Sequence, residues 1–359
     1  KFEYDSTGRL LRTVTSDLNV TSSDVDSKLY ESKYAYTKLN QVKKELVTAG
    51  GKQLVSSYTY NENQQPLKVT MPGGETSEYT YDGLGRLTGK NISADEAMSQ
   101  KYVYWPSERN AEGESLYKTT QVAREAMGTF GYFYQYDDMG NIIQVNRGIR
   151  TGDTNILTDY VAQAGYEYDS KGQMIRENNA DLDKTIVYNY DDGGNLTSKE
   201  FYPYTIEALT GQPDETITYT YDSTWKDLLL TYGEDDIEYD EIGNPLEYRG
   251  ADLDWQGREL KSFTKNGTTI SYTYGTDGIR TKKVVGNEVH EYYYSSGLLA
   301  YEKRGNLQFY YTYDHEGNLC RIRYINAGGQ SEYYYPAVNI RGDVQAIFDE
   351  TGTLEAEYV

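Results

Sequence analysis

A short aromatic motif returns along the whole chain and limits what it can fold into. The pattern is Tyr-x-Tyr-Asp-x-x-Gly-x-[Leu/Ile], and the copy at Tyr188–Leu196 is complete. Two further copies, Phe2–Asp5 and Ile237–Asp240, change only the first residue. The motif residues are Tyr79, Tyr81, Asp82, Gly85, Tyr134, Tyr136, Asp137, Gly140, Tyr166, Tyr168, Asp169, Gly172, Tyr188, Tyr190, Asp191, Gly194, Tyr219, Tyr221, Asp222, Tyr239, Asp240, Gly243, Tyr311, Tyr313, Asp314 and Gly317.

Each part of the motif has a physical role in a β-hairpin. Alternate side chains of a strand share one face, so the two tyrosines stand side by side and can pack on the next strand. The aspartate ends the strand by accepting backbone N–H groups, and the glycine takes the positive φ that a tight reversal needs. The apolar residue after Gly-x begins the return strand. One repeat therefore predicts one hairpin.

Repetition at this spacing favours one continuous array over separate domains. Motif starts follow one another at steps of mostly about 16 to 24 residues, which predicts roughly thirty strands. An open sheet rarely exceeds about ten strands without curling, so this one must close, spiral or split. We predict an all-β fold in which residues 1–359 form a single curved, spiralling sheet around a hollow. Longer steps predict inserted loops at about residues 105–131, 148–164 and 201–216.

Composition supports a thin wall rather than a solid globule. The chain has 40 tyrosines against seven phenylalanines and a mean hydropathy of -0.77. A tyrosine ring buries area while its hydroxyl stays wet, and the regular aromatic alternation argues against disorder. The net charge of -21 disfavours nucleic acid as a partner, because phosphate binding needs clustered Lys and Arg. No apolar run is long enough for a membrane helix, so we expect no membrane insertion.

The repeated motif resembles that of the RHS/YD-repeat family, which includes bacterial Rhs and cell-wall-associated proteins, insecticidal toxin-complex shells and the teneurins. The resemblance covers essentially the whole chain. Residues 333–359 resemble the beginning of the RHS-associated core segment, with Asn339, Gly342, Asp343, Asp349 and Gly352 at its pattern positions. The chain is expected to be a fragment of a larger protein.

The resemblance implies a hollow shell that encloses a C-terminal toxin or other polypeptide of the same chain. In family members that process themselves, an Asp-Pro motif beyond the core releases the cargo. This sequence contains no Asp-Pro pair, so self-cleavage is assigned to none of its residues. A secreted or surface-displayed bacterial scaffold without enzymatic activity, metal or cofactor is the leading expectation. The alternative is a surface module that binds carbohydrate or a protein partner.

Few residues suggest chemistry outside the repeat. His315 and Cys320 lie five apart across a turn and could form a Cys-His pair, although a small buried residue suits the start of a strand equally well. His290 is the other histidine. Four acidic groups could suggest calcium or a glycosidase pair: Asp137-Asp138, Asp191-Asp192, Asp235-Asp236 and Asp181-x-Asp183. The first two belong to the repeating turn, where the first aspartate is already explained as a cap.

Two short motifs are more readily explained by chance. Arg341-Gly342-Asp343 spells an adhesion tripeptide, but its glycine and aspartate already fit the core-segment pattern. Asn-x-Ser/Thr sequons would matter only in a eukaryotic secretory route; they lie at Asn19, Asn91, Asn195 and Asn266.

Overall fold

The computed structural model describes residues 2–16, 28–93, 98–105, 108–109, 115–116, 121–150, 156–339 and 341–358. These residues form thirty-three β-strands and no α-helix. They accordingly include no helix long and apolar enough to cross a membrane. The prediction of an all-β hairpin array is confirmed.

The strands pair antiparallel, nearly always with their neighbours in sequence. Nineteen form one continuous sheet in which β9 pairs directly with β12. They are β1 (Phe2–Tyr4), β2 (Leu10–Ser16), β3 (Lys28–Tyr36), β4 (Val42–Ala49), β5 (Lys52–Tyr60), β6 (Pro66–Thr70), β7 (Thr76–Tyr81), β8 (Leu87–Ile92), β9 (Gln100–Tyr104), β12 (Val122–Met127), β13 (Phe130–Tyr136), β14 (Ile142–Arg150), β15 (Leu157–Tyr168), β16 (Met174–Asn179), β17 (Lys184–Tyr190), β18 (Leu196–Pro203), β19 (Glu215–Tyr221), β20 (Leu229–Tyr232) and β21 (Asp235–Asp236).

A second sheet of twelve strands continues the array after a break. At the break, Tyr239 and Pro245 form an isolated antiparallel β-bridge in place of two paired strands. The twelve strands are β22 (Glu247–Tyr248), β23 (Ala251–Gln256), β24 (Glu259–Lys265), β25 (Thr268–Tyr274), β26 (Arg280–Val285), β27 (Glu288–Ser295), β28 (Leu298–Arg304), β29 (Leu307–Tyr313), β30 (Leu319–Ile325), β31 (Ser331–Val338), β32 (Val344–Asp349) and β33 (Leu354–Glu357). A separate small hairpin pairs β10 (Glu108–Arg109) with β11 (Ser115–Leu116).

The loop interpretation of the insertions is wrong in part. Residues 122–127 and 130–136 are strands β12 and β13, and residues 157–164 lie in the twelve-residue strand β15. Buried positions such as Met127 and Phe130 explain the error, because consecutive residues of these strands are buried, and a strand that is covered on both faces loses the clean alternation. Residues 204–214 do connect two strands without forming one. The rest of these insertions, 106–107, 110–114, 117–120 and 151–155, lies outside the described residues.

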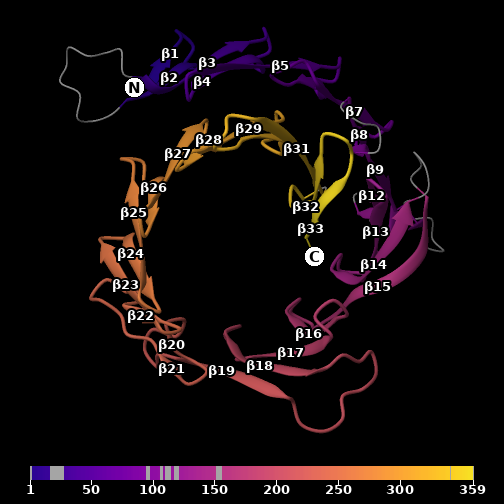
Figure 1. The fold of residues 1–359 in the computed structure, drawn as a ribbon. Helices are drawn as coiled ribbons and strands as arrows, with labels where there is room; N and C mark the ends of the chain where they lie inside the picture. Colours follow the sequence, from indigo (N-terminus) through magenta and orange to yellow (C-terminus); the bar gives the residue numbers. More distant parts are fainter. Residues whose placement is uncertain are drawn as a thin grey trace.

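The sheet winds into a spiral whose end passes inside its beginning (Figure 1). Strands β27–β33, the inner layer, lie against β3–β14, the outer layer, and three clusters of buried residues fill the space between them. One cluster joins Phe130 and Tyr132 to Phe348, a second joins Tyr30 to Tyr310, and the third holds Cys320. The hydrophobic core therefore lies between the two layers, where the wall overlaps itself.

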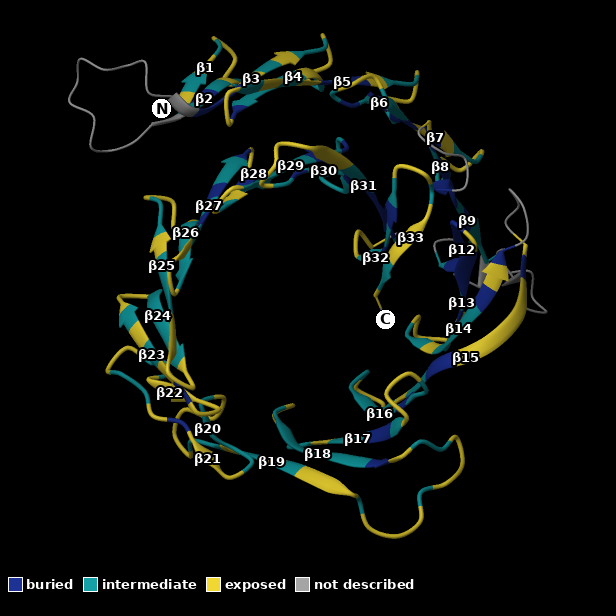
Figure 2. Cartoon of the chain, in the orientation of Figure 1, coloured by how far each residue is buried: buried dark blue, intermediate teal, exposed yellow. Residues whose placement is uncertain are grey.

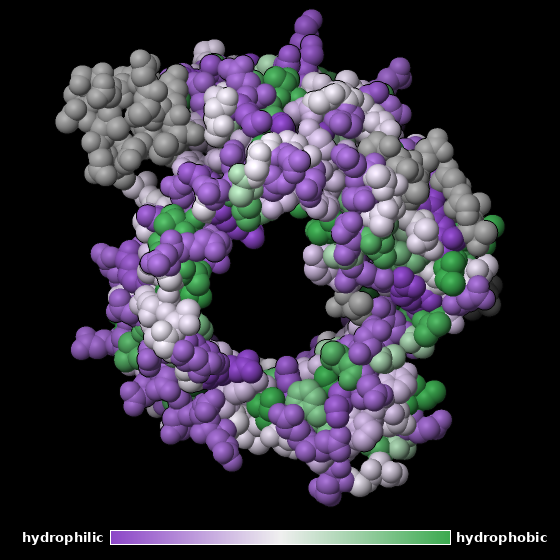
Figure 3. All heavy atoms as spheres, in the orientation of Figure 1, coloured by the Kyte–Doolittle hydropathy of each residue, from purple (hydrophilic) through white to green (hydrophobic). Residues whose placement is uncertain are grey.

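The remaining arc is one sheet thick. Residues 180–285, all of them described, bury only four hydrophobic side chains: Ile186, Tyr202, Ile237 and Ala251. Figure 2 shows the same contrast, with buried segments concentrated in the overlap and partly exposed ones around the rest of the ring. Figure 3 shows an open passage through the centre in this view. The prediction of a curved wall around a hollow is confirmed.

Candidate functional site: the inner face and the overlap

The turn of a complete repeat is capped by its own aspartate. In the hairpin of β17 and β18, Asp191 Oδ1 accepts the backbone N–H of Asn195 at 2.9 Å, and Gly194 has a φ of 92°. These N–H groups stabilise the ionised carboxylate, so the Asn195 side chain and backbone lower the pKa of Asp191. The same cap to the residue four later occurs at Asp5, Asp82, Asp137, Asp169, Asp240, Asp314 and Asp349.

Residues 333–339 and 341–358 continue this geometry in the inner layer. Asn339 accepts the N–H of Asp343 at 2.9 Å, and Gly342 has a φ of 90°. Asp349 and Gly352 repeat the arrangement one hairpin later. The core-like residues thus form two further capped turns, and the Arg341-Gly342-Asp343 tripeptide is one of them, with Asp343 held by the Asn339 side chain.

The hydroxyl of the second tyrosine of the motif is hydrogen-bonded to the backbone. Tyr190 Oη donates to the carbonyl of Met174 at 2.9 Å, which is the first residue of the preceding return strand. Trp255 replaces the tyrosine in an eroded copy and donates its indole N–H to Pro245. Equivalent bonds join Tyr36 to Leu10, Tyr60 to Val42, Tyr136 to Val122, Tyr168 to Ile142, Tyr221 to Leu196, Tyr239 to Leu229, Tyr274 to Leu260, Tyr294 to Arg280 and Tyr313 to Leu299.

In four repeats, the first tyrosine is paired with a glutamate of the preceding strand. Tyr188 Oη donates to Glu177 at 2.7 Å, and Tyr311 Oη donates to Glu302 at 2.8 Å. Burial, followed by the nearby carboxylate, raises the pKa of each of these hydroxyls, so they remain neutral donors. Tyr134 and Tyr58 make the same pairing with Glu125 and Glu45.

These paired tyrosines line the inward side of the wall. In the overlap, Tyr79 and Tyr102 contact the inner layer, which Figure 1 places on the side of the central space. Tyr166 lines a pocket together with Asn339 and Arg341 of the inner layer. By the same strand register, Tyr188 and Tyr219 of the single-layered arc face the central space. The inner face is therefore an aromatic surface with ordered hydroxyl and carboxylate groups.

Polar contacts join the two layers along their whole overlap. Arg147 binds Glu357 through two bonds of 2.6 and 2.8 Å, and the fully buried Arg321 binds Glu75 at 2.6 Å. Gln100 Nε2 donates to the Val338 carbonyl at 2.7 Å. Buried polar groups with partners fix the register of one layer on the other.

Close packing also fixes the position of one layer on the other. A Cβ atom on Gly50 would lie 2.5 Å from the Tyr310 hydroxyl, whereas one on the adjacent Gly51 would meet no atom within 4 Å. Gly128 lies against the Phe348 ring in the same way. Glycine at these two positions allows the inner layer to approach the backbone of the outer one.

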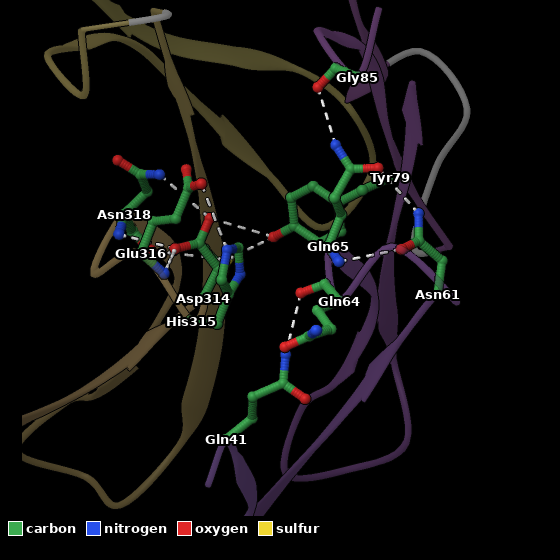
Figure 4. A network of polar contacts seen from close by, with 11 residues as sticks. Gln41, Asn61, Gln64, Gln65, Tyr79, Gly85, Asp314, His315, Glu316 and Asn318 are labelled. Carbon is green, nitrogen blue, oxygen red and sulfur yellow. Dashed lines mark hydrogen bonds and ion pairs between the residues drawn. The ribbon is translucent and has the colours of Figure 1, made fainter. Parts of the chain in front are cut away.

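The predicted Cys-His pair does not form a nucleophilic arrangement. Cys320 is fully buried, burial raises the pKa of its thiol, and its neighbour is the Tyr79 hydroxyl at 3.7 Å. His315 instead contacts Glu316 at 3.4 Å and packs edge-on against Tyr79 (Figure 4). The described residues show no hydrogen bond between His315 and Cys320, and Cys320 is part of the core cluster.

The other candidate residues are dispersed. His290 is nearly buried between Glu288 and Glu302, and Asp235-Asp236 form the short strand β21. The described residues contain no group of three His, Cys, Asp or Glu side chains able to hold a metal ion. Of the sequons, Asn91 lies in β8, Asn195 and Asn266 lie in turns, and Asn19 is outside the described residues.

Comparison with known proteins agrees with this architecture. Residues 60–91 match the family model of the RHS repeat. Two curated relatives match over 199 residues, which are 53% of this chain but only 8% of each relative. They are the tRNA3(Ser)-specific nuclease WapA of Bacillus spizizenii, 27% identical, and the tRNA nuclease WapA of Bacillus subtilis strain 168, 26% identical.

Solved structures match the complete wall. The crystal structure of TcdB2-TccC3-Cdc42 covers 99% of this chain with a TM-score of 0.56 and 19% identity, and this chain covers 17% of it. TcdB2-TccC3 without its hypervariable C-terminal region gives a TM-score of 0.55 and 16% identity, over 99% of this chain and 22% of that one. The resemblance to the RHS/YD-repeat family is thereby confirmed, and the wall has the fold of these two structures.

Proposed function

We propose that this chain is a non-enzymatic shell scaffold of a secreted or surface-displayed bacterial protein, and that the shell encloses a C-terminal effector polypeptide. The observation that carries the proposal is the closure of the wall by its own overlap around a central space. Backbone hydrogen bonds continue from hairpin to hairpin and leave few unpaired edges along the wall. Such a wall limits the access of proteases through its side to whatever it surrounds.

The comparisons support this role. The matching relatives are named as tRNA nucleases, and they are far longer than the matched region. One matching shell is described by the removal of a hypervariable C-terminal region. A shell segment within a longer toxic protein fits both facts, with the cargo located in another part of the same polypeptide.

Limited proteolysis of the complete natural polypeptide tests the proposal. We expect mass spectrometry to show a downstream segment that resists protease in the intact protein and is digested when it is produced alone. Urea that unfolds the shell should abolish the protection. Equal digestion rates inside and outside the shell, or a natural polypeptide with no downstream segment, would contradict the proposal.

The outer surface favours a second candidate function, the binding of a carbohydrate or protein partner. Trp105, Phe133 and Tyr160 line a groove of about 450 Å³ together with Arg124 and Asn146. Phe133 alternates with the inward-facing Tyr132 and Tyr134, so this groove lies on the outside of the wall. Aromatic rings beside amide and guanidinium groups suit a sugar. Glycan-array binding that is lost in Trp105→Ala and retained in Trp225→Ala would support this function; no binding by the wild type would exclude the groove.

A further inference from the structure

A cleft of about 580 Å³ opens between the two layers near the turns. Its outer wall comes from β3–β5, and its inner wall comes from the turns that follow β27 and β29. Figure 4 shows part of its lining, with Gln41 and Gln64 on one side and His315 and Glu316 on the other. The size is that of a site for a small ligand or a single side chain.

Negative groups dominate the charge of the cleft. Its charged lining residues are Glu45, Asp314 and Glu316, and no lysine or arginine is among them. Asp314 is already held by the N–H groups of its turn, and Glu316 contacts His315. Glu45 differs from both, because hydroxyl groups are its donors.

Ser295 donates to Glu45 at 2.6 Å, and Tyr58 donates at 3.5 Å. Among the ion pairs of the described residues, none involves Glu45. Its carboxylate therefore lacks the positive partner that a partly buried charge requires. A cation in the cleft would supply that partner.

Aromatic residues line the same cleft; they are Tyr34, Tyr58 and Tyr60 of the outer layer and Tyr311 and Tyr313 of the inner layer. Of these, Tyr58 donates to Glu45, and Tyr34 contacts Ser295, the other donor to this carboxylate. The face of a tyrosine ring attracts a cation within about 6 Å. This wall uses the same attraction elsewhere on its repeat tyrosines, since Arg280 lies over both Tyr272 and Tyr292 at 5.4 and 5.3 Å.

We propose that this cleft binds an organic cation, an ammonium or guanidinium group, with Glu45 as the counter-ion and the tyrosine rings as its walls. The cation can belong to a small amine or to a lysine or arginine side chain of a polypeptide. The site lies between the layers and does not depend on the enclosure of a cargo.

Calorimetric titration of the 359-residue chain tests the site. The probes are choline, its uncharged isostere 3,3-dimethyl-1-butanol, and capped pentaglycine with a central arginine or glutamine. We expect choline to bind at least about tenfold more tightly than the isostere, because only the charged group gains the carboxylate and the ring faces. Binding of the arginine peptide alone would identify a polypeptide side chain as the source and would equally support the site.

Two variants locate the binding. Glu45→Gln should weaken choline by about tenfold or more, whereas Glu78→Gln, which removes an exposed partner of Lys68, should leave it unchanged. Unfolding midpoints of both variants check that the fold is kept. In the wild type, choline should also shift the methyl resonance of Ala300, which lines the cleft, and leave that of Ala251 in place. Equal binding of choline and its isostere, no binding of any charged probe, or a Glu45→Gln variant with wild-type affinity would overturn the proposal.

Discussion

The tyrosine hydroxyl is the residue-scale feature that sets this wall apart from an ordinary aromatic sheet. Tyr190 bonds to the carbonyl of Met174, and its counterparts repeat the bond from one hairpin to the next. Each of these hydrogen bonds links the last residue of one strand to the first residue of an earlier strand. Phenylalanine would pack as well but could not make this tie, which accounts for the excess of tyrosine in the sequence.

Removal of one such hydroxyl should weaken the wall measurably. We expect Tyr190→Phe to lower the free energy of unfolding by about 0.5–1.5 kcal/mol, the usual net contribution of a hydrogen bond, because the Met174 carbonyl loses its donor. Tyr160→Phe is the matched control, since this exposed side chain has no such bond. Urea unfolding of the three proteins provides the measurement, and equal losses in both variants would contradict the role of the hydroxyl.

The capping aspartates should make stability depend on acid pH. N–H donors lower the pKa of Asp82, Asp191 and Asp240 below the ordinary value of 3.8. The stabilisation is therefore complete above that value and is lost as the pH falls through the lower pKa of the folded state. We expect the urea midpoint to fall between pH 5 and about pH 3.

Replacement of a capping aspartate by asparagine removes the charge of the side chain and keeps the geometry of the turn. Asn326 and Asn339 already cap turns in this chain, so Asp191→Asn should keep the turn. The variant should lose less stability than the wild type over the same acid range, because it has one fewer carboxylate to protonate. A midpoint that falls as steeply in the variant as in the wild type would exclude Asp191 as a contributor.

At the scale of the strand and hairpin, the sequence predicts most of what the structure contains. Tyr190 ends β17, Leu196 begins β18, and the aspartate and glycine between them form the turn that their residue types favour. The long strand β15 and the buried strands β12 and β13 were harder to predict, because packing against a distant layer replaced the local alternation. The cleft around Glu45 was also beyond the sequence, since residues 250 positions apart meet there.

Glycines of the outer layer show how tertiary contact overrides local conformation. Gly50 and Gly51 are adjacent and both have positive φ, so alanine strains the backbone at either. Only Gly50→Ala places a methyl group against the Tyr310 hydroxyl. We expect it to destabilise the protein by about 1–3 kcal/mol more than Gly51→Ala, as measured by urea unfolding. Equal effects would mean that the two layers separate easily at this point.

At the scale of the whole molecule, the contacts between the two overlapping layers fix the diameter of the spiral. The two layers share three apolar clusters and the ion pairs Arg147–Glu357 and Arg321–Glu75. Elsewhere each hairpin contacts little beyond its neighbours, so the stability of the single-layered arc depends on adjacent repeats. The overlap is therefore the part of the wall where distant repeats support each other.

Loss of one ion pair should loosen the overlap. Glu75→Ala leaves the buried Arg321 without its carboxylate, and we expect a loss of about 1–3 kcal/mol, as for a hydrogen bond to a charged group. Glu78→Ala, which breaks an exposed pair with Lys68, should change stability by no more than about 0.5 kcal/mol. Urea unfolding gives the energies, and small-angle scattering reports any increase in the radius of the particle. Equal losses in the free energy of unfolding for the two variants would mean that the apolar clusters alone hold the two layers together.

The way in which the wall closes has an evolutionary consequence. A cylinder joined edge to edge by hydrogen bonds fixes its strand number and stagger together, so an added strand disturbs the join. This wall overlaps itself, and its single-layered arc between residues 180 and 285 lies outside that overlap. A duplication or deletion of one hairpin in this arc would change the volume of the central space by a small step. Walls that descend from one ancestor can in this way differ in the size of the space that they surround.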